Sequence, residues 1–205
     1  MFKFKILGLL LLFLCLSWTA QGKKHLIANN PDSIIAQGYF ELGNDCRSKG
    51  DVCAAERFFL KAINVYPGNA WAYVILGNLY DVDMQDGEKA KPYYLKAIEL
   101  NANCAEAYAL MGSYYYGKYN STNKYEYLLI SRQYSQKAIA LAPRMAVSVY
   151  NNIGFTFQYE GNCDSAEYYF KKGIELWPKD QHSYTNLAHL YYFQANDIYF
   201  DKPKK

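Results

Sequence analysis

The sequence has almost no excess charge of either sign, and it has few histidines. Its 205 residues include 22 Lys and Arg against 19 Asp and Glu, a balance that argues against binding to a phosphate backbone or an anionic membrane. The histidines are His25, His182 and His189. The last two are seven residues apart, about 10 Å along a helix, which is too far to share one metal ion. A glycine-rich phosphate loop, a Ser-His-Asp set and an HExxH motif are also missing. We therefore expect no enzyme, no cofactor or metal, and no nucleic-acid partner.

A hydrophobic run long enough to span a bilayer is absent too. Lys3 and Lys5 precede the apolar run 6–18, and the small residues Ala20 and Gly22 follow it, whereas a spanning helix needs about 20 apolar residues. This pattern predicts a secretory signal peptide over residues 1–22, and hence a periplasmic or extracellular protein with no stable membrane insertion after cleavage. The alternatives are an uncleaved anchor and a lipid anchor at Cys15, which the large residue before that cysteine disfavours. Cleavage would leave 22 − 2 = 20 basic and 19 acidic residues.

One pattern of residues recurs from residue 36 onward. Counted from residue 36, it has an aromatic at place 4, Leu-Gly at 7 and 8, Ala at 20, an aromatic at 24, Ala at 27 and Pro at 32. In the first repeat these are Tyr39, Leu42, Gly43, Ala55, Phe59, Ala62 and Pro67. The segments 36–69, 70–104, 105–146 and 147–180 follow the pattern, and residues 181–194 repeat its first half. The spacing predicts two short amphipathic helices joined by a turn in each repeat.

This pattern resembles the tetratricopeptide repeat. The resemblance implies an all-α, right-handed superhelical solenoid over residues 36–194, in which residues 181–194 form a capping helix. Residues 23–35 would be an N-terminal lead-in, and residues 195–205 a basic C-terminal tail. The resemblance also implies a concave surface, lined by the first helix of each repeat, that binds a peptide.

Local features refine the expected helices. Asp32 follows a proline and is expected to cap the first helix. Pro92 predicts a helix that starts late or bends. In the second repeat the turn at 81–86 holds one extra residue. The third repeat has about seven extra residues around 117–126. Seven residues are close to two helical turns, which predicts lengthened helices. Asn123 and Glu126 resemble a capping box.

The insert at 117–126 admits two interpretations. It is either a longer surface hairpin or a projecting finger whose tyrosines touch a partner, because surplus surface aromatics are enriched at interfaces. The five tyrosines concerned are Tyr114, Tyr116, Tyr119, Tyr125 and Tyr127.

The groove positions implied by the resemblance carry amides and large apolar side chains. Asparagines recur at places 6 or 9 of the first helices, and a carboxamide offers both a donor and an acceptor to a peptide backbone. Pockets between apolar groove residues would select side chains of the peptide. The expected peptide-binding residues are Asn44, Trp71, Asn78, Leu110, Asn152, Phe155 and Asn186. The 18 further groove places that the resemblance implies are Gln37, Phe40, Glu41, Arg47, Val74, Ile75, Asp81, Glu106, Ala109, Ser113, Tyr116, Ser148, Asn151, Gln158, Tyr159, His182, Thr185 and His189. The alternative is that these amides bind neighbouring helix ends or water.

Cys46 and Cys53 flank the turn of the first repeat and can form an optional disulfide; buried free thiols are the alternative. The leading hypothesis for function is an exported protein–protein interaction module that binds a peptide segment in its groove. The alternative is a structural subunit that docks into an envelope complex through its outer face or the insert at 117–126.

Overall fold

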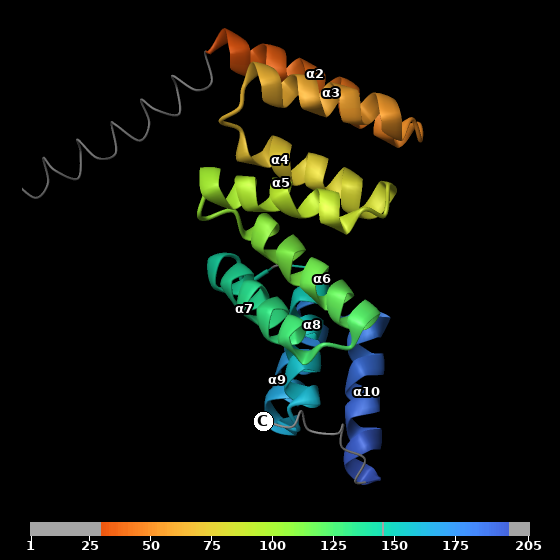
Figure 1. Cartoon of the computed structure of the whole chain (residues 1–205). Helices are drawn as coiled ribbons and strands as arrows, with labels where there is room; N and C mark the ends of the chain where they lie inside the picture. The colour runs from red at the N-terminus through yellow and green to blue at the C-terminus, as the bar shows by residue number, and fades with distance from the viewer. Residues whose placement is uncertain (1–29, 145, 197–205) are drawn as a thin grey trace, which may run out of the picture. The chain divides into compact units, whose positions relative to one another are not determined.

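The structure, a computed structural model, describes residues 30–144 and 146–196, which form helices and connecting turns without a strand. The expected all-α class is confirmed. The chain divides into two compact units, residues 1–72 and 73–205, with the boundary inside helix α4 (Figure 1). The predicted signal peptide at 1–22 and the lysines of the tail lie outside the described residues.

The described part of the first unit is a pair of helices, α2 (Pro31–Ser48) and α3 (Val52–Val65), followed by the start of α4. The cap of α2 is Asn30, whose side chain accepts a hydrogen bond from the Asp32 backbone N–H at 2.9 Å. The prediction that Asp32 is the cap was wrong. Proline suits the first position of a helix because its missing N–H would be unpaired there, so the cap lies before Pro31.

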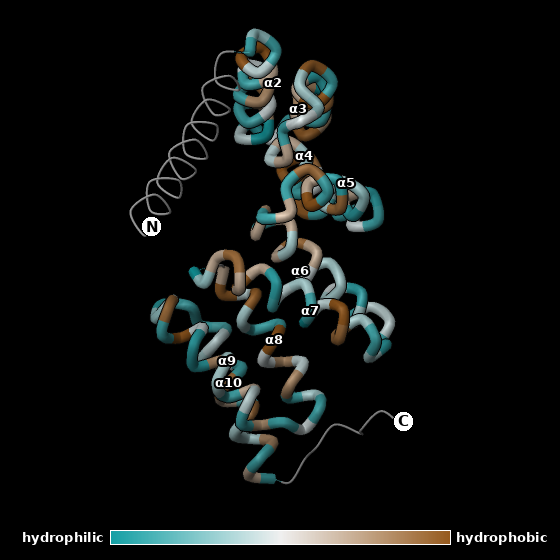
Figure 2. The backbone as a smooth tube through the Cα atoms, turned by 90° about the vertical axis from the view of Figure 1, so that its left-hand side faces the viewer, coloured by the Kyte–Doolittle hydropathy of each residue, from teal (hydrophilic) through white to brown (hydrophobic). Residues whose placement is uncertain are grey.

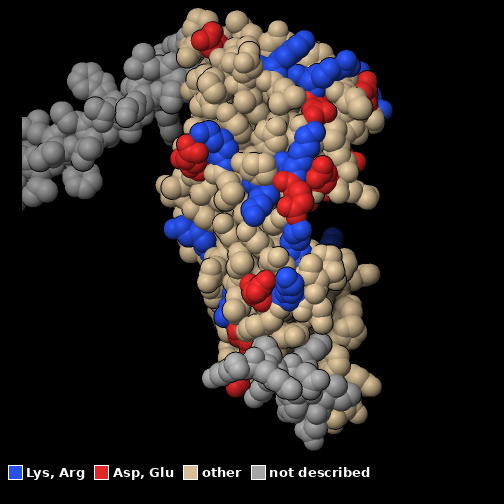
Figure 3. All heavy atoms as spheres, in the orientation of Figure 1, with Lys and Arg blue, Asp and Glu red and all other residues tan. Residues whose placement is uncertain are grey.

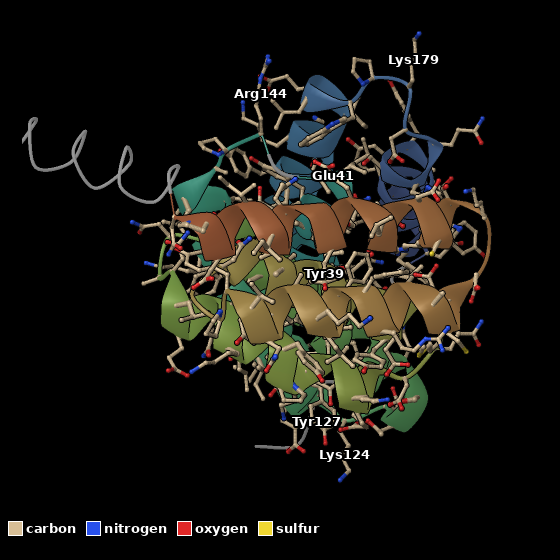
Figure 4. All side chains as sticks on the ribbon, turned by 90° about the horizontal axis from the view of Figure 1, so that it is seen from above. Tyr39, Glu41, Lys124, Tyr127, Arg144 and Lys179 are labelled. Carbon is tan, nitrogen blue, oxygen red and sulfur yellow. The ribbon has the colours of Figure 1, made fainter. Side chains whose placement is uncertain are left out.

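A glycine and an aromatic ring meet where α2 and α3 lie side by side. A Cβ atom on Gly43 would come within 2.5 Å of the Phe59 ring, which is fully buried. Beside this contact Tyr39 lies between the two helices and stacks on Phe58 with ring centroids 6.4 Å apart (Figure 4). The expected rule, a small residue at place 8 and a ring at place 24, therefore describes the packing of this pair.

The second unit continues with alternating helices. They are the rest of α4 (Ala70–Asn78), the π-helix η1 (Leu79–Asp83), α5 (Gly87–Leu100), α6 (Ala105–Thr122), α7 (Tyr125–Leu141), α8 (Val147–Tyr159), α9 (Cys163–Leu176) and α10 (Gln181–Ala195). Hydrophobic and hydrophilic segments alternate along these helices in Figure 2. The glycine–ring contact recurs in two further helix pairs. A Cβ atom on Gly77 would lie 2.6 Å from the Tyr94 ring, and one on Gly154 would lie 2.6 Å from the Phe170 ring.

The third helix pair, α6 with α7, departs from this rule. Where the other helix pairs of this chain have a ring, this pair has Ser135, whose Oγ would be 2.5 Å from a Cβ on Gly112. Ser135 Oγ is buried without a hydrogen-bond partner, while the neighbouring Ser131 hydroxyl donates to the Gly112 carbonyl at 2.7 Å. A small residue on each helix thus replaces the glycine–ring contact in this pair.

The extra residue expected at 81–86 is accommodated by η1, in which the helix widens to i→i+5 hydrogen bonds. The prediction that α5 starts late was wrong, since it begins at Gly87 under an Asp86 cap that accepts the Lys89 N–H at 3.0 Å. Pro92 lies inside the helix. It removes the partner of the Glu88 carbonyl, and both residues are exposed, so water can bind that carbonyl.

The insert lengthens α6 and α7, as the residue count predicts. The predicted capping box was wrong: Asn123 ends α6 in the left-handed conformation with φ of 52°, and Lys124 precedes α7 without a side-chain cap. A short polar side chain tolerates this conformation, so the chain turns sharply between the two helices.

The interpretation of the insert as a tyrosine-bearing finger was also wrong. Tyr114 and Tyr119 are buried and the other three tyrosines are half-buried, because their rings pack on neighbouring rings of the second unit. Tyr125 stacks on Tyr159 at 5.2 Å between centroids, and Tyr127 stacks on Tyr115 at 6.1 Å. These tyrosines therefore join α6 and α7 to each other and to α8.

The last helix, α10, covers the preceding pair. Leu190 of α10 is fully buried in a cluster with Ala166 and Phe170 of α9. Lysine and arginine side chains alternate with acidic ones on the face drawn in Figure 3. Within the described ranges, no helix is both long and apolar enough to cross a membrane.

Candidate functional site

A pocket of about 350 Å³ lies in the second unit, where α8 contacts both α6 and α10. Helix α8 supplies most of its wall, α6 supplies one tyrosine, and the N-terminal end of α10 closes the remaining side. The lining residues are Tyr116, Val147, Ser148, Asn151, Asn152, Phe155, Asp180, His182 and Asn186.

This pocket brings together three of the seven expected peptide-binding residues, Asn152, Phe155 and Asn186. Four of the 18 further groove places, Tyr116, Ser148, Asn151 and His182, also line it, and the other fourteen do not. They meet because first helices of successive repeats present the same face.

The other expected residues lie elsewhere. Leu110 packs on the core cluster of Val74, Ala97, Cys104 and Ala107, so its contacts are with the interior of the second unit. Asn78 is half-buried at the end of α4. In the first unit, Asn44 is exposed on α2, and Trp71 is 45% exposed.

Asn152 is unusual because its polar side chain is buried without a partner. Only 6% of the residue is exposed, and no described residue bonds to its carboxamide; its backbone carbonyl accepts from Thr156 at 2.9 Å. The carboxamide atoms are nevertheless not sealed from solvent, since the residue lines the pocket. The carboxamide therefore has donor and acceptor atoms that a ligand in the pocket can reach.

The sequence reasoning missed Asp180, the pocket's one carboxylate. Asp180 caps α10: its Oδ2 accepts the Ser183 N–H at 2.9 Å and faces the Ser183 hydroxyl at 3.1 Å. The same hydroxyl donates to Asn151 Oδ1 at 3.1 Å, so one proton is shared between two acceptors. An aspartate just before a predicted helix is a cap signal, and that signal could have placed Asp180 here.

The charge of Asp180 persists at neutral pH. Burial alone would raise the pKa of its carboxyl, but hydrogen bonds from the Ser183 backbone, from His182 and from the Ser183 hydroxyl together hold that pKa below its ordinary value. His182 Nδ1 lies 3.3 Å from Oδ1, and the His182 side chain is 87% exposed. Oδ1 thus faces an exposed side chain.

Two aromatic rings form the opposite wall. Tyr116 meets Phe155 edge to face, with centroids 5.4 Å apart and planes at 89°. Burial raises the pKa of Tyr116, so its phenol stays neutral. Tyr119 packs behind Phe155 at 5.9 Å and fixes that ring. The pocket therefore combines amides, one carboxylate and rigid aromatic rings.

A second cavity of about 430 Å³ in the same unit lies beside η1, but its acidic groups already have partners. Asp81 accepts a hydrogen bond from Tyr94 Oη at 3.2 Å, and Glu88 accepts one from Tyr114 Oη at 3.0 Å and pairs with Lys118. Burial raises the pKa of Asp81, and the Tyr94 hydrogen bond partly offsets that rise. These contacts hold α5 to η1 and α6, so the pocket with the unpartnered asparagine is the better candidate.

The described cysteines are free thiols, so the optional bridge between Cys46 and Cys53 is not formed in the structure. Across the described part of the chain, no group of three or more His, Cys, Asp and Glu is placed to hold a metal ion.

Comparison with known proteins finds a family match for one segment of the chain. Residues 72–104 match the family profile described as Tetratricopeptide repeat. A comparison with curated protein sequences returns no match.

Solved structures share the fold at low identity. The crystal structure of MamA protein aligns with a TM-score of 0.64 at 23% identity, covering 80% of this chain and 83% of that one. PilF of Pseudomonas aeruginosa gives 0.67 at 20%, covering 86% and 80%. YrrB, described as a TPR protein with an unusual peptide-binding site, gives 0.62 at 22%, covering 84% of each chain. Residues 72–104 thus match the tetratricopeptide repeat, and the chain shares the fold of these solved structures.

Proposed function

We propose that this protein is an exported interaction module that binds an extended peptide segment in the pocket formed by α6, α8 and α10. The observation that carries the proposal is the buried, unpartnered carboxamide of Asn152 at the pocket wall. A peptide backbone supplies both a donor and an acceptor at each residue, which is what a carboxamide needs.

The neighbouring groups suit the same ligand. Asn186 adds a second carboxamide to the pocket lining, and Phe155 with Tyr116 offers an apolar surface for a side chain of the peptide. The similar protein YrrB is described as having a peptide-binding site, which supports this class of ligand. The remaining expected residues, Asn44, Trp71, Asn78 and Leu110, do not line this pocket and are not part of the proposed site.

Export rests on the sequence of residues 1–22 alone. The proposed peptide partner would therefore be met in the periplasm or outside the cell, with no enzymatic turnover and no nucleic acid. Docking into an envelope complex through the insert is less favoured, because the tyrosines that would make that contact pack within the second unit.

The test is selection of binders from a random peptide display library, followed by affinity measurement on the purified chain. Asn152→Leu replaces the carboxamide with an apolar group of similar size. We expect it to lower peptide affinity about tenfold or more, because a buried hydrogen bond is lost. We also expect stability to stay the same or rise, because a costly buried amide is removed.

The matched control is Asn103→Leu, the same replacement at an exposed asparagine of the second unit, which should leave affinity unchanged. The charge swap of Lys124→Glu with Glu126→Lys changes the exposed tip of the insert without changing net charge. If the charge swap abolished binding and Asn152→Leu left it intact, the docking hypothesis would replace the groove hypothesis.

A further inference from the structure

We propose that the pocket selects an arginine side chain of the bound segment. This inference rests on the proposed peptide-binding function and adds the chemical identity of the residue that enters the pocket. It follows from the pocket's charge, from the acceptors that remain open, and from its aromatic wall.

The pocket has a negative group and no lysine or arginine to neutralise it. Among its nine lining residues, Asp180 is the only acidic one and none is Lys or Arg. The Asp180 side chain is 17% exposed, so its charge is screened less than that of a surface carboxylate. An acidic side chain of a ligand would be repelled here, and a cationic one attracted.

The open hydrogen-bonding atoms in this pocket include several acceptors. Oδ2 of Asp180 is used by Ser183, whereas Oδ1 faces only the exposed His182 ring, at 3.3 Å. The carbonyl oxygens of the Asn152 and Asn186 carboxamides add two more acceptors to the pocket lining. A ligand group with several N–H donors pointing in different directions would satisfy all three.

Arginine fits this arrangement better than lysine. A guanidinium carries five N–H donors in a planar fork, stays charged at all relevant pH values and stacks on aromatic faces. Phe155 and Tyr116 line the same pocket and meet edge to face, so a guanidinium on a ring face outside that contact would add a cation–π contact to the carboxylate contact. A lysine ammonium offers three donors at one point and is more strongly hydrated.

The test uses peptides selected from the random display library and resynthesised with the arginine replaced by citrulline, its neutral isostere. Against the unaltered protein, citrulline should lower affinity about tenfold, as expected for the loss of one charge-assisted contact. Against Asp180→Asn, the same replacement should lower affinity less than about twofold. Asparagine is as good a helix cap as aspartate, so α10 remains capped in this variant.

The matched control is Asp51→Asn. Asp51 caps α3 in the first unit, accepts the Ala54 N–H at 2.9 Å, and its replacement changes net charge by the same amount. This variant should retain the full tenfold preference for arginine over citrulline.

The outcomes separate the inference from the proposed function. Selected peptides that depend on Asn152 but show no arginine preference, or an equal citrulline loss with and without Asp180, would overturn the inference and leave peptide binding standing. Failure to select any peptide, or binding that Asn152→Leu leaves unchanged, would overturn both.

Discussion

A glycine inside a helix costs about 1 kcal/mol relative to alanine, yet four helix pairs have one at the same place. In three of them, at Gly43, Gly77 and Gly154, the space of the missing Cβ is filled by a ring of the partner helix. Phe59 and Phe170 are fully buried by this contact. Burial of a ring contributes more than the glycine costs, which explains why the repeat combines the two residues.

Replacing Gly43 with alanine should therefore destabilise the first helix pair. The new Cβ would lie 2.5 Å from Phe59 Cε1, and the fully buried ring has little room to shift. We expect a loss of about 1–3 kcal/mol in the free energy of unfolding, as for other overpacked cores. Urea denaturation, with amide hydrogen exchange in α2 and α3, would measure it.

Gly38→Ala is the control on the same helix. A Cβ there meets nothing within 4 Å, so the substitution should stabilise α2 by up to about 1 kcal/mol through helix propensity and unfolded-state entropy. If Gly43→Ala were as stable as Gly38→Ala, the ring contact would not be the reason for the glycine.

Single residues also show the limits of sequence reasoning. Asn152, Phe155 and Asn186 could be assigned to one surface because their places in the repeat are fixed by helical periodicity. Asp180 lies outside that periodicity, because it precedes its helix and reaches the pocket as the helix cap; only the cap signal in the sequence could have identified it. The cap of α2 was misassigned to Asp32 for a related reason: the choice among neighbouring polar residues depends on backbone angles that the sequence does not state.

Between elements, one partly buried network fixes α7 to the end of α8. Glu160 accepts hydrogen bonds from Tyr125 Oη and from Arg132 Nη1, each at 2.5 Å. The Arg132 guanidinium also lies 4.7 Å from the centre of the Phe157 ring. Both charged side chains are less than a quarter exposed, so this ion pair is better shielded than a surface pair.

Glu160→Ala should lower the free energy of unfolding by about 1–3 kcal/mol, because it leaves a partly buried guanidinium and a phenol without their acceptor. The control is Glu175→Ala, which breaks the exposed i,i+3 pair with Lys172 and should change stability by no more than about 0.5 kcal/mol. Thermal unfolding of the two variants would compare them. Equal effects would mean that the network adds nothing to the docking of α7 on α8.

The lengths of α6 and α7 were predictable because adding two whole turns keeps a buried face in phase. The π-helix η1 was not, since one extra residue can be placed in a turn or inside a helix at similar cost. The packing of the insert's tyrosines was missed because it depends on α8, whose rings Phe155 and Tyr159 lie 30 to 40 positions away in sequence. Long-range ring contacts of this kind do not appear in a repeat pattern.

For the whole molecule, the question is how an array of stacked helices ends. Each helix pair leaves an apolar face that the next one covers, so the last pair needs a cover of its own. In this chain α10 provides it through Leu190, which lies against Ala166 and Phe170. The same helix contributes Asn186 to the pocket, so stability and recognition use different faces of one element.

These two roles can be separated by mutation. Leu190→Ala should lower the free energy of unfolding by about 2–5 kcal/mol, the usual cost of a cavity in a core. At temperatures where the variant remains folded, it should bind peptide as the unaltered chain does, because the pocket residues are intact. A chain ending at residue 180 should expose Phe170 and bind a hydrophobic dye, whereas one ending at 196 should not. If the chain ending at 180 unfolded as cooperatively and at the same temperature as the full chain, α10 would serve recognition alone and the array would close on α9.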